Sequence, residues 1–301
     1  MKKPKPLWRV SVVTTLEAED AVGELLASVF SLAAASYYDL EKQVSLVSVF
    51  IEQGKFSPAG ARREIAAGLQ RIAGFGLSLG AGKIEIAKVK REDWAESWKR
   101  HFHPIEIGKT LLVKPSWSKK SPAKNQAVVI LDPGLSFGTG QHPTTSFCLQ
   151  QITRHRKNGT QPSSFLDIGT GSGILAIAAA KLGCQPVHAF DFDPASVRVA
   201  KENLRKNRVT GQVKLWRADV TKLPLKPARQ FDLVCANLIS NLLIAERWRI
   251  VNRLQPGGTL VLAGILAVEF TEVERAFADL GLKLTASRVE NEWRSGAFCF
   301  V

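Results

Sequence analysis

A glycine-rich stretch at residues 167–173, with the sequence DIGTGSG, constrains the fold of this chain more than any other feature. A short apolar run at 164–168 leads into it, and a helical stretch at 174–182 follows it. Glycines between a strand and a helix allow a tight turn and let a ligand lie against backbone N–H groups. The stretch therefore predicts the first strand, loop and helix of an open sheet that binds its ligand at the carboxyl ends of the strands.

The rest of the C-terminal half continues this alternation. Further strands are predicted at 187–191, 213–216, 231–236, 259–263, 282–288 and 296–301, and helices at 195–206, 240–254 and 268–280. Strands that alternate with helices at this spacing indicate a parallel sheet with helices on both faces. The last two strands lack an intervening helix and should pair as an antiparallel hairpin. The fold class is therefore α/β, a doubly wound seven-stranded Rossmann-like sheet.

The N-terminal third has a different pattern. Strands are predicted at 7–14, 46–51 and 83–89, with an amphipathic helix that reaches residue 37 and a second helix at 58–75. This order suggests a small N-terminal α+β domain of ferredoxin-like kind. We expect a first domain over 1–90, a connector over 91–127 and a second domain over 128–301.

Composition fits a folded chain of two domains. The 301 residues are 45% hydrophobic and 23% charged, which excludes a disordered chain or a coiled coil. Four scattered cysteines (Cys148, Cys184, Cys235, Cys299) form no C-x-x-C pair, so we expect neither a disulfide framework nor a metal site. No run of eighteen apolar residues predicts a membrane span, and acidic residues at 17–24 argue against a signal peptide. We expect a cytoplasmic monomer.

The net charge of +14 does not by itself indicate that the protein binds nucleic acid. Residues 1–125 hold 20 basic and 13 acidic side chains, and residues 126–301 hold 21 and 14. The surplus of positive charge is the same in both parts, so it indicates neither a basic tail nor a concentrated basic face. The pairs Arg62-Arg63 and Lys119-Lys120 read as solvated surface charge. Direct binding of nucleic acid is not expected.

An acid at the end of the second predicted strand indicates what the glycine loop binds. Asp191 lies 22 residues beyond Gly169, where a carboxylate can accept hydrogen bonds from both hydroxyls of a ribose. A dinucleotide fingerprint would need a third glycine at position 174, which is Ile174. The spacing G-x-G-x-G, preceded by Asp167, is instead typical of S-adenosylmethionine binding. Glycines at such a turn can also serve packing alone.

One further stretch narrows the prediction to a family. Residues 131–146 read LDPGLSFGTGQHPTTS, and this run resembles the signature of the ribosomal protein L-eleven (L11) methyltransferase family, PrmA. Residues 92–104, 168–193, 236–238 and 263–266 resemble the same family. The similarity covers about 92–301 well and is not obvious in 1–91.

The resemblance implies a class I methyltransferase that uses S-adenosylmethionine and methylates lysine side chains and an N-terminal amine of L11. It places Thr145, Gly169, Asp191 and Asn237 at cofactor-contacting positions, together with Gly171 of the same loop. Asn237 would face the methyl-transfer site and act in catalysis. The chain departs from the family at Phe192, where an aliphatic residue is usual, and at Gln141 in place of a common threonine.

Methyl transfer from a sulfonium depends mainly on the alignment of the nucleophile, the methyl carbon and the sulfur, and it does not need a strong base. A sulfonium activates its own methyl group, and the acceptor must be a neutral amine whose remaining N–H bonds a group such as the Asn237 side chain can orient. His142 is open to two interpretations: a base, or a residue that fixes its loop by hydrogen bonding. Trp94 and Trp98 either bind a ligand or pack a connector helix onto a domain.

Two rival functions stay open. The first is a related enzyme that acts on a lysine of another protein or on a small amine. The second is a nucleic-acid-binding protein with a vestigial methyltransferase fold, which the even charge distribution does not favour.

Overall fold

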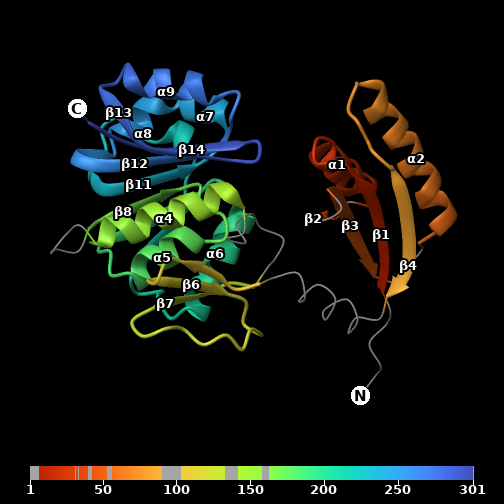
Figure 1. Ribbon diagram of the computed structural model, residues 1–301, viewed down its shortest axis with the longest axis horizontal. Coiled ribbons are helices and arrows are strands. Elements are labelled where there is room, and N and C mark those ends of the chain that lie inside the picture. Colours follow the sequence, from red (N-terminus) through yellow and green to blue (C-terminus); the bar gives the residue numbers. More distant parts are fainter. Residues whose placement is uncertain are drawn as a thin grey trace. The chain divides into compact units, whose positions relative to one another are not determined.

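The computed structural model describes residues 7–30, 32, 34–39, 43–52, 56–89, 103–132, 142–157 and 163–300. The chain divides into two compact units, Met1–His101 and Phe102–Val301 (Figure 1). Among the described residues, no helix has the length and apolar character that a bilayer crossing requires. The predicted helix with Trp94 and Trp98, part of the predicted connector and residues 133–141 of the family signature lie outside the described residues.

The first unit is a four-stranded antiparallel sheet with two helices. Its elements are β1 (Leu7–Thr14), α1 (Glu19–Phe30), β2 (Ala35–Asp39), β3 (Val44–Glu52), α2 (Pro58–Gly74) and β4 (Lys83–Val89). The strand order is β2-β3-β1-β4, which is that of a ferredoxin-like sandwich. Val10 and Val12 of β1 and Val47 and Val49 of β3 alternate toward the helices and pack with their buried residues, among them Leu26.

The strand β2 corrects one sequence prediction. The helix expected to reach residue 37 ends at Phe30, and residues 35–39 pair with β3. The apolar spacing of the helix runs on past its end, so periodicity alone overextends it. Tyr37 and Tyr38 are strand formers, and the free edge of β3 supplies the partner that makes this segment a strand.

The second unit contains the predicted seven-stranded sheet. Its strands are β8 (Phe165–Ile168), β9 (Val187–Asp191), β10 (Val213–Arg217), β11 (Phe231–Asn237), β12 (Leu254–Leu266), β13 (Leu282–Glu290) and β14 (Trp293–Phe300). They are ordered β10-β9-β8-β11-β12-β14-β13. The first five are parallel, and β13 and β14 pair antiparallel, so the predicted hairpin is confirmed.

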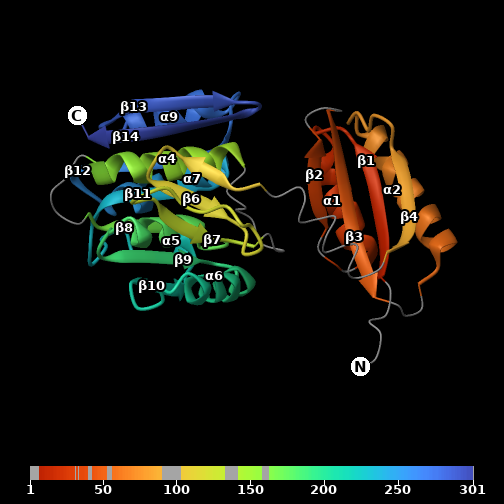
Figure 2. The same cartoon turned by 60° about the horizontal axis from the view of Figure 1, so that its bottom comes forward.

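Helices cover both faces of this sheet (Figures 1 and 2). They are α4 (Pro143–Lys157), α5 (Ile174–Lys181), α6 (Pro194–Lys206), α7 (Ser240–Ala245), α8 (Arg247–Val251) and α9 (Phe270–Ala278). Buried side chains of α4 and α5 join one core cluster, and those of α7, α8 and α9 join a second. A sheet covered on both faces explains why its central strands read as continuous apolar runs.

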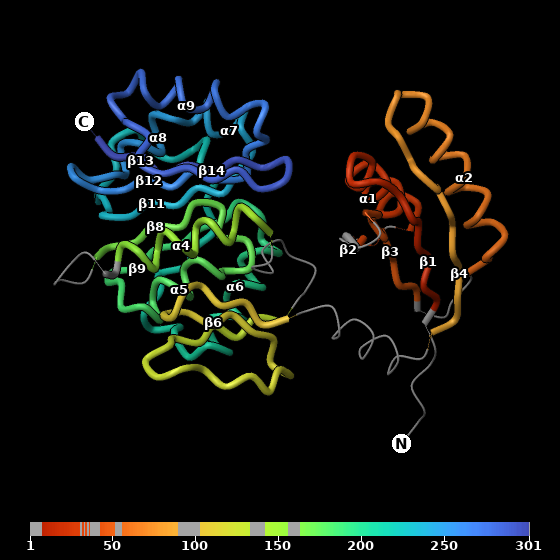
Figure 3. The backbone as a smooth tube through the Cα atoms, in the orientation of Figure 1, coloured from red at the N-terminus to blue at the C-terminus, as the bar shows by residue number. Residues whose placement is uncertain are grey.

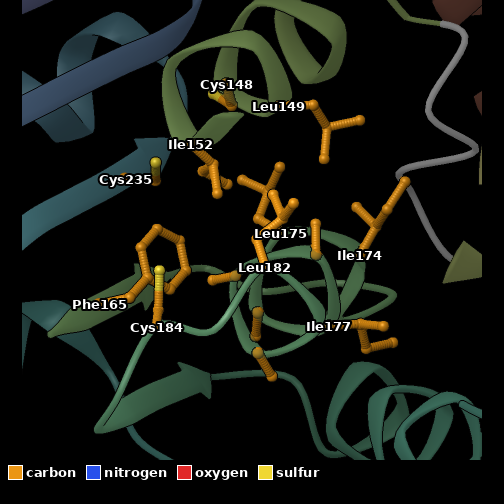
Figure 4. Packing of buried hydrophobic residues seen from close by; sticks show 14 of the residues in the cluster. Cys148, Leu149, Ile152, Phe165, Ile174, Leu175, Ile177, Leu182, Cys184 and Cys235 are labelled. Atoms are coloured by element: carbon orange, nitrogen blue, oxygen red, sulfur yellow. The ribbon is translucent and has the colours of Figure 1, made fainter. Parts of the chain in front are cut away.

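The first of these clusters is seen at close range in Figure 4. Side chains of α4 and α5 fill the space above the central strands, including Cys148, Leu149, Ile152, Ile174, Leu175 and Ile177. Cys148, Cys184 and Cys235 are free thiols in this core, as expected of small buried residues. This packing holds α4, and with it the residues at its start, against the sheet.

A small sheet that spans the end of the predicted connector and the start of the predicted second domain was not foreseen. Strands β5 (Ile105–Ile107), β6 (Leu111–Lys114) and β7 (Ala127–Ile130) pair in that order and pack into the same core as α4 and α5. The Asn207 side chain, just after α6, accepts from the Ile130 N–H and donates to the Ile130 carbonyl, both at 2.7 Å. This side chain bonds the end of β7 much as a neighbouring strand would. The neighbouring strands β8, β11 and β12 of the second unit can be followed in the tube of Figure 3.

Candidate active site

A cavity of about 550 Å³ opens at the carboxyl ends of β8, β9 and β11 in the second unit. It is lined by the glycine loop after β8, by the residues that follow β9, β10 and β11, and by the start of α4. Because the strand order is β9-β8-β11, the loop lies between the ends of β9 and β11. This is the position at which doubly wound sheets bind their ligands.

The glycine loop has a backbone that other residues would strain. Gly169, Gly171 and Gly173 have φ values of 73°, 53° and 82°, in the left-handed region. The N–H groups of Gly169 and Thr170 both donate to the Phe190 carbonyl at 3.0 Å, which ties the loop to β9. A Cβ on Gly169 would lie 2.6 Å from Cδ2 of Leu238. The left-handed φ of Gly169 favours glycine at this position, and a larger residue would also have to displace the end of the Leu238 side chain.

Beneath the loop lies a buried acid, Asp167. Its Oδ2 accepts a hydrogen bond from the Thr170 hydroxyl at 2.6 Å, and the residue is 1% exposed. Burial raises the pKa of the Asp167 carboxyl to about 7, although the bond from Thr170 opposes that rise. This carboxyl therefore titrates near neutral pH.

Asp191 ends β9 and binds the loop from the other side. Its Oδ2 accepts from the Gly171 N–H at 2.8 Å, and its Oδ1 accepts from the Asp193 N–H at 3.0 Å. A carboxylate offers about four lone-pair sites, so each oxygen retains capacity for one more donor. Asp193 in turn caps α6 by accepting from the N–H groups of Ala195 and Ser196, and these bonds lower the pKa of its carboxyl.

The end of β11 carries a different set of groups. Asn237 lies in register with Ala263 of β12, and the Leu238 N–H donates to the Ala263 carbonyl at 3.0 Å. A Cβ on Gly264 would lie 2.7 Å from the Leu238 carbonyl oxygen and 2.9 Å from Oδ1 of Asn237. The lack of a side chain at 264 therefore leaves room for two hydrogen-bond acceptors that lie close together in the cavity wall.

The start of α4 forms a further wall of the cavity. Pro143 opens the helix, where a missing N–H costs nothing, and Thr144 and Thr145 follow as buried residues of the first turn. Nδ1 of His142 lies 2.7 Å from the Thr144 hydroxyl. The His142 ring packs edge-on to Trp293, with their centres 4.9 Å apart. These contacts hold His142 in place at the cavity wall.

All five residues predicted from the sequence line this one cavity: Thr145, Gly169, Gly171, Asp191 and Asn237. They come from four different segments, which the tertiary fold brings together. Sequence reasoning did not assign Ile239, Gly264 or Trp293 to the site, although they line the same cavity. Gly264 and Trp293 fall in stretches that resemble the family, whereas no pattern in the sequence indicated Ile239.

Comparisons with known proteins indicate one family. The sequence profile described as "Ribosomal protein L11 methyltransferase (PrmA)" matches residues 6–298. A ribosomal protein L11 methyltransferase of Chloroflexus aurantiacus is 40% identical over 233 residues, which are 70% of each chain. The enzyme of the same name from Syntrophotalea carbinolica is 39% identical over 248 residues, 82% of this chain and 78% of that one.

A solved structure supports the same assignment. The ribosomal protein L11 methylase of Lactobacillus delbrueckii subsp. bulgaricus superposes with a TM-score of 0.59 at 30% identity. The match covers 66% of this chain and 99% of that one. With the profile match across both units, the chain belongs to the ribosomal protein L11 methyltransferase (PrmA) family of class I S-adenosylmethionine-dependent methyltransferases.

Proposed function

We propose that this protein transfers methyl groups from S-adenosylmethionine to lysine side chains, to the N-terminal amine, or to both, of ribosomal protein L11. The observation that carries the proposal is the single cavity lined by the glycine loop, Asp191 and Asn237. Family membership supplies the reaction class and the protein substrate. The choice of amines as acceptors follows from the family resemblance, and the two acceptor oxygens at the end of β11 are compatible with it.

The residues of the cavity fit the cofactor by their chemistry. The glycine loop brings its backbone to the cavity wall, and each oxygen of Asp191 can accept one more hydrogen bond, which matches the two hydroxyls of a ribose. Thr145 and Gly169 complete this side of the site in the proposal. When bound, S-adenosylmethionine supplies a methyl group on a positively charged sulfur.

On the acceptor side, the protein has to orient a neutral amine. An ammonium has no lone pair, and lysine has an ordinary pKa near 10.4, so the site must favour the neutral form. A partly desolvated cavity next to a positive charge does this. Oδ1 of Asn237 and the Leu238 carbonyl accept the N–H bonds that remain, and this directs the lone pair of the amine. The released proton passes to water.

We further propose separate roles for the parts of the chain. Residues 1–90 recognise the protein substrate, residues 91–127 connect, and residues 128–301 bind the cofactor and transfer the methyl group. The residues that line the cavity all belong to the second unit. The ferredoxin-like unit is therefore a separate folded part of the chain that can bind the protein substrate, which supports the first assignment. We expect a cytoplasmic monomer that does not bind nucleic acid directly.

The test is methyl transfer to purified L11 that carries no methyl groups. We expect the intact mass of L11 to rise by whole methyl groups when the protein and S-adenosylmethionine are both present. Peptide mapping then assigns them to lysine side chains or the N-terminus. An unchanged mass of L11, with the protein folded and the cofactor bound, would refute the substrate. Transfer to another protein in a ribosomal extract would then favour the rival acceptor.

A further inference from the structure

Two apolar side chains at the cavity are largely exposed to solvent. Phe192 is 69% exposed and Ile239 is 67% exposed, and both line the cavity. Other apolar residues of its wall, such as Ile168, Ile174 and Phe190, are buried in the core. Single exposed apolar side chains are common on protein surfaces, but two at the wall of one cavity indicate contact with something that enters it.

The two residues lie on opposite sides of the glycine loop. Phe192 follows Asp191 at the end of β9, and Ile239 lies two residues beyond Asn237 at the end of β11. Strand β8, which leads into the loop, runs between β9 and β11. Phe192 therefore stands next to the carboxylate proposed for the ribose, and Ile239 next to the amide proposed for the acceptor amine.

The Ile239 side chain neither packs into the neighbouring core nor caps a helix. The preceding Leu238 turns inward over the glycine loop, at the place where a Cβ on Gly169 would meet it. Ile239 occupies the N-cap of α7 with φ −64° and ψ 147°, and its side chain makes no capping bond. Ser, Thr, Asp and Asn are favoured at this position. An apolar residue that is neither buried nor replaced by a polar residue at an N-cap departs from both local preferences, and such departures are expected at functional sites.

The turn that carries Ile239 is nevertheless held in place. The buried Ser240 hydroxyl donates to Oε2 of Glu269 at 2.6 Å, which joins the start of α7 to the residue before α9. The Leu238 N–H is bonded to β12 on the other side. Ile239 is thus presented to solvent from a backbone that is fixed on both sides, as a specificity contact requires.

We propose that Ile239 contacts the methylene chain of the acceptor lysine and so selects amines on a long aliphatic stem. This inference rests on the proposed function and adds a specificity residue to it. An amine at Asn237 has to be reached from outside, and an unbranched apolar stem that enters past Ile239 removes apolar surface of both groups from water. An N-terminal α-amine has no such stem and gains less from this contact.

The experiment compares Ile239→Ser with Ile239→Val and with the matched variant Phe192→Ser. Serine is a favoured N-cap, so Ile239→Ser is not expected to weaken α7, and valine keeps a branched apolar group. Phe192 is equally exposed on the other side of the same cavity. Each protein is assayed with unmethylated L11 at saturating S-adenosylmethionine, and its affinity for the cofactor is measured by calorimetry.

We expect Ile239→Ser to lower kcat/KM for L11 by about tenfold, the scale of one lost methylene-sized contact, with cofactor affinity within about twofold of the original. Lysine sites should lose more methylation than the N-terminal site, and Ile239→Val should keep most of the activity. Phe192→Ser should show the reverse pattern: weaker cofactor binding, and kcat/KM for L11 largely kept once the cofactor saturates.

Either of two results would overturn the assignment of Ile239. One is an unchanged kcat/KM for L11 in Ile239→Ser, and the other is a loss of cofactor affinity as large as that in Phe192→Ser. A failure of the proposed function looks different. In that case the unsubstituted protein binds S-adenosylmethionine but transfers nothing to L11, and the inference about Ile239 falls with it.

Discussion

The two sides of the cavity differ in how their polar groups are held. At the end of β9, both oxygens of Asp191 already accept backbone N–H bonds, from Gly171 and Asp193. At the end of β11, the Asn237 side chain has no hydrogen-bond partner within the part of the chain that the structure describes. Fixed groups suit a ligand that is the same at every turnover. Uncommitted groups suit an acceptor whose N–H bonds change as it is methylated.

The strongest test of this contrast is Asp191→Ala. It removes the two charge-assisted hydrogen bonds that we propose to the ribose, of about 2 kcal/mol each, so we expect about a thousandfold loss of affinity for S-adenosylmethionine. Calorimetry measures the affinity, and circular dichroism checks that the fold is kept. The exposed acid Asp279 at the end of α9 gives the matched control, Asp279→Ala, with no change in affinity. Cofactor binding within a few-fold of the original in Asp191→Ala would remove Asp191 from the site.

The buried acid beneath the loop, Asp167, should make the stability of the protein depend on pH. The pKa of Asp167 is about 7 in the folded protein and has an ordinary value of 3.8, so the folded state binds this proton more tightly. Its contribution to stability is complete below about pH 4 and is lost as pH rises through about 7. From about pH 5 to pH 8, the stability of the original protein relative to Asp167→Asn should fall by roughly 2–3 kcal/mol.

Chemical denaturation of both proteins at these two pH values measures the difference. Asp279→Asn, at an exposed position, is the control for a general effect of removing an acid. Parallel stability curves for the original protein and Asp167→Asn would contradict the raised pKa.

A smaller effect is expected on the β11 side, from Asn237→Ala. One hydrogen bond to the amine is lost, which corresponds to about a tenfold decrease in kcat. The loss of cofactor affinity should be smaller than this decrease, which separates the variant from Asp191→Ala. Steady-state kinetics with L11 and calorimetry with S-adenosylmethionine supply the two values. A loss of cofactor affinity with kcat unchanged at saturating cofactor would place Asn237 on the cofactor side alone.

The smallest effect is expected from His142→Ala. His142 bonds Thr144 and packs on Trp293, so we predict that it supports the wall at the start of α4 and leaves turnover within about twofold, with cofactor binding somewhat weaker. The pH–rate profile at saturating cofactor decides between the two interpretations. A decrease in kcat of about a hundredfold, together with loss of one limb of the profile, would instead establish a general base.

Much of the fold could be predicted because its signals are local. The strands and helices of the second unit follow from apolar runs and glycine turns, and the terminal hairpin follows from the missing helix between β13 and β14. Two features were missed for the same physical reason. Strand β2 and the sheet of β5, β6 and β7 are short, and each becomes a strand only because a partner strand lies beside it.

The candidate site was predictable to a similar extent. Gly169, Gly171 and Asp191 stand at positions where the order of strand, loop and acid already indicates a nucleoside ligand. Thr145 and Asn237 required the family resemblance, since a threonine and an asparagine carry no local signal of this kind. Ile239 had neither signal, because what distinguishes it is its 67% exposure at a cavity wall, which no sequence pattern encodes.

The glycine loop, the acid that ends the second strand of the sheet and the alternation of strands with helices were determined by the sequence itself, because each depends on backbone freedom and apolar period over a few residues. Tertiary structure decided which side chains share one cavity, how deeply each is buried and which of their hydrogen-bonding groups are still available to a ligand. Asp167 titrates near neutral pH only because the core buries it, and Asn237 and Ile239 line the cavity only because β11 ends beside the loop. Burial and convergence are properties of the packed chain, and no single segment contains them.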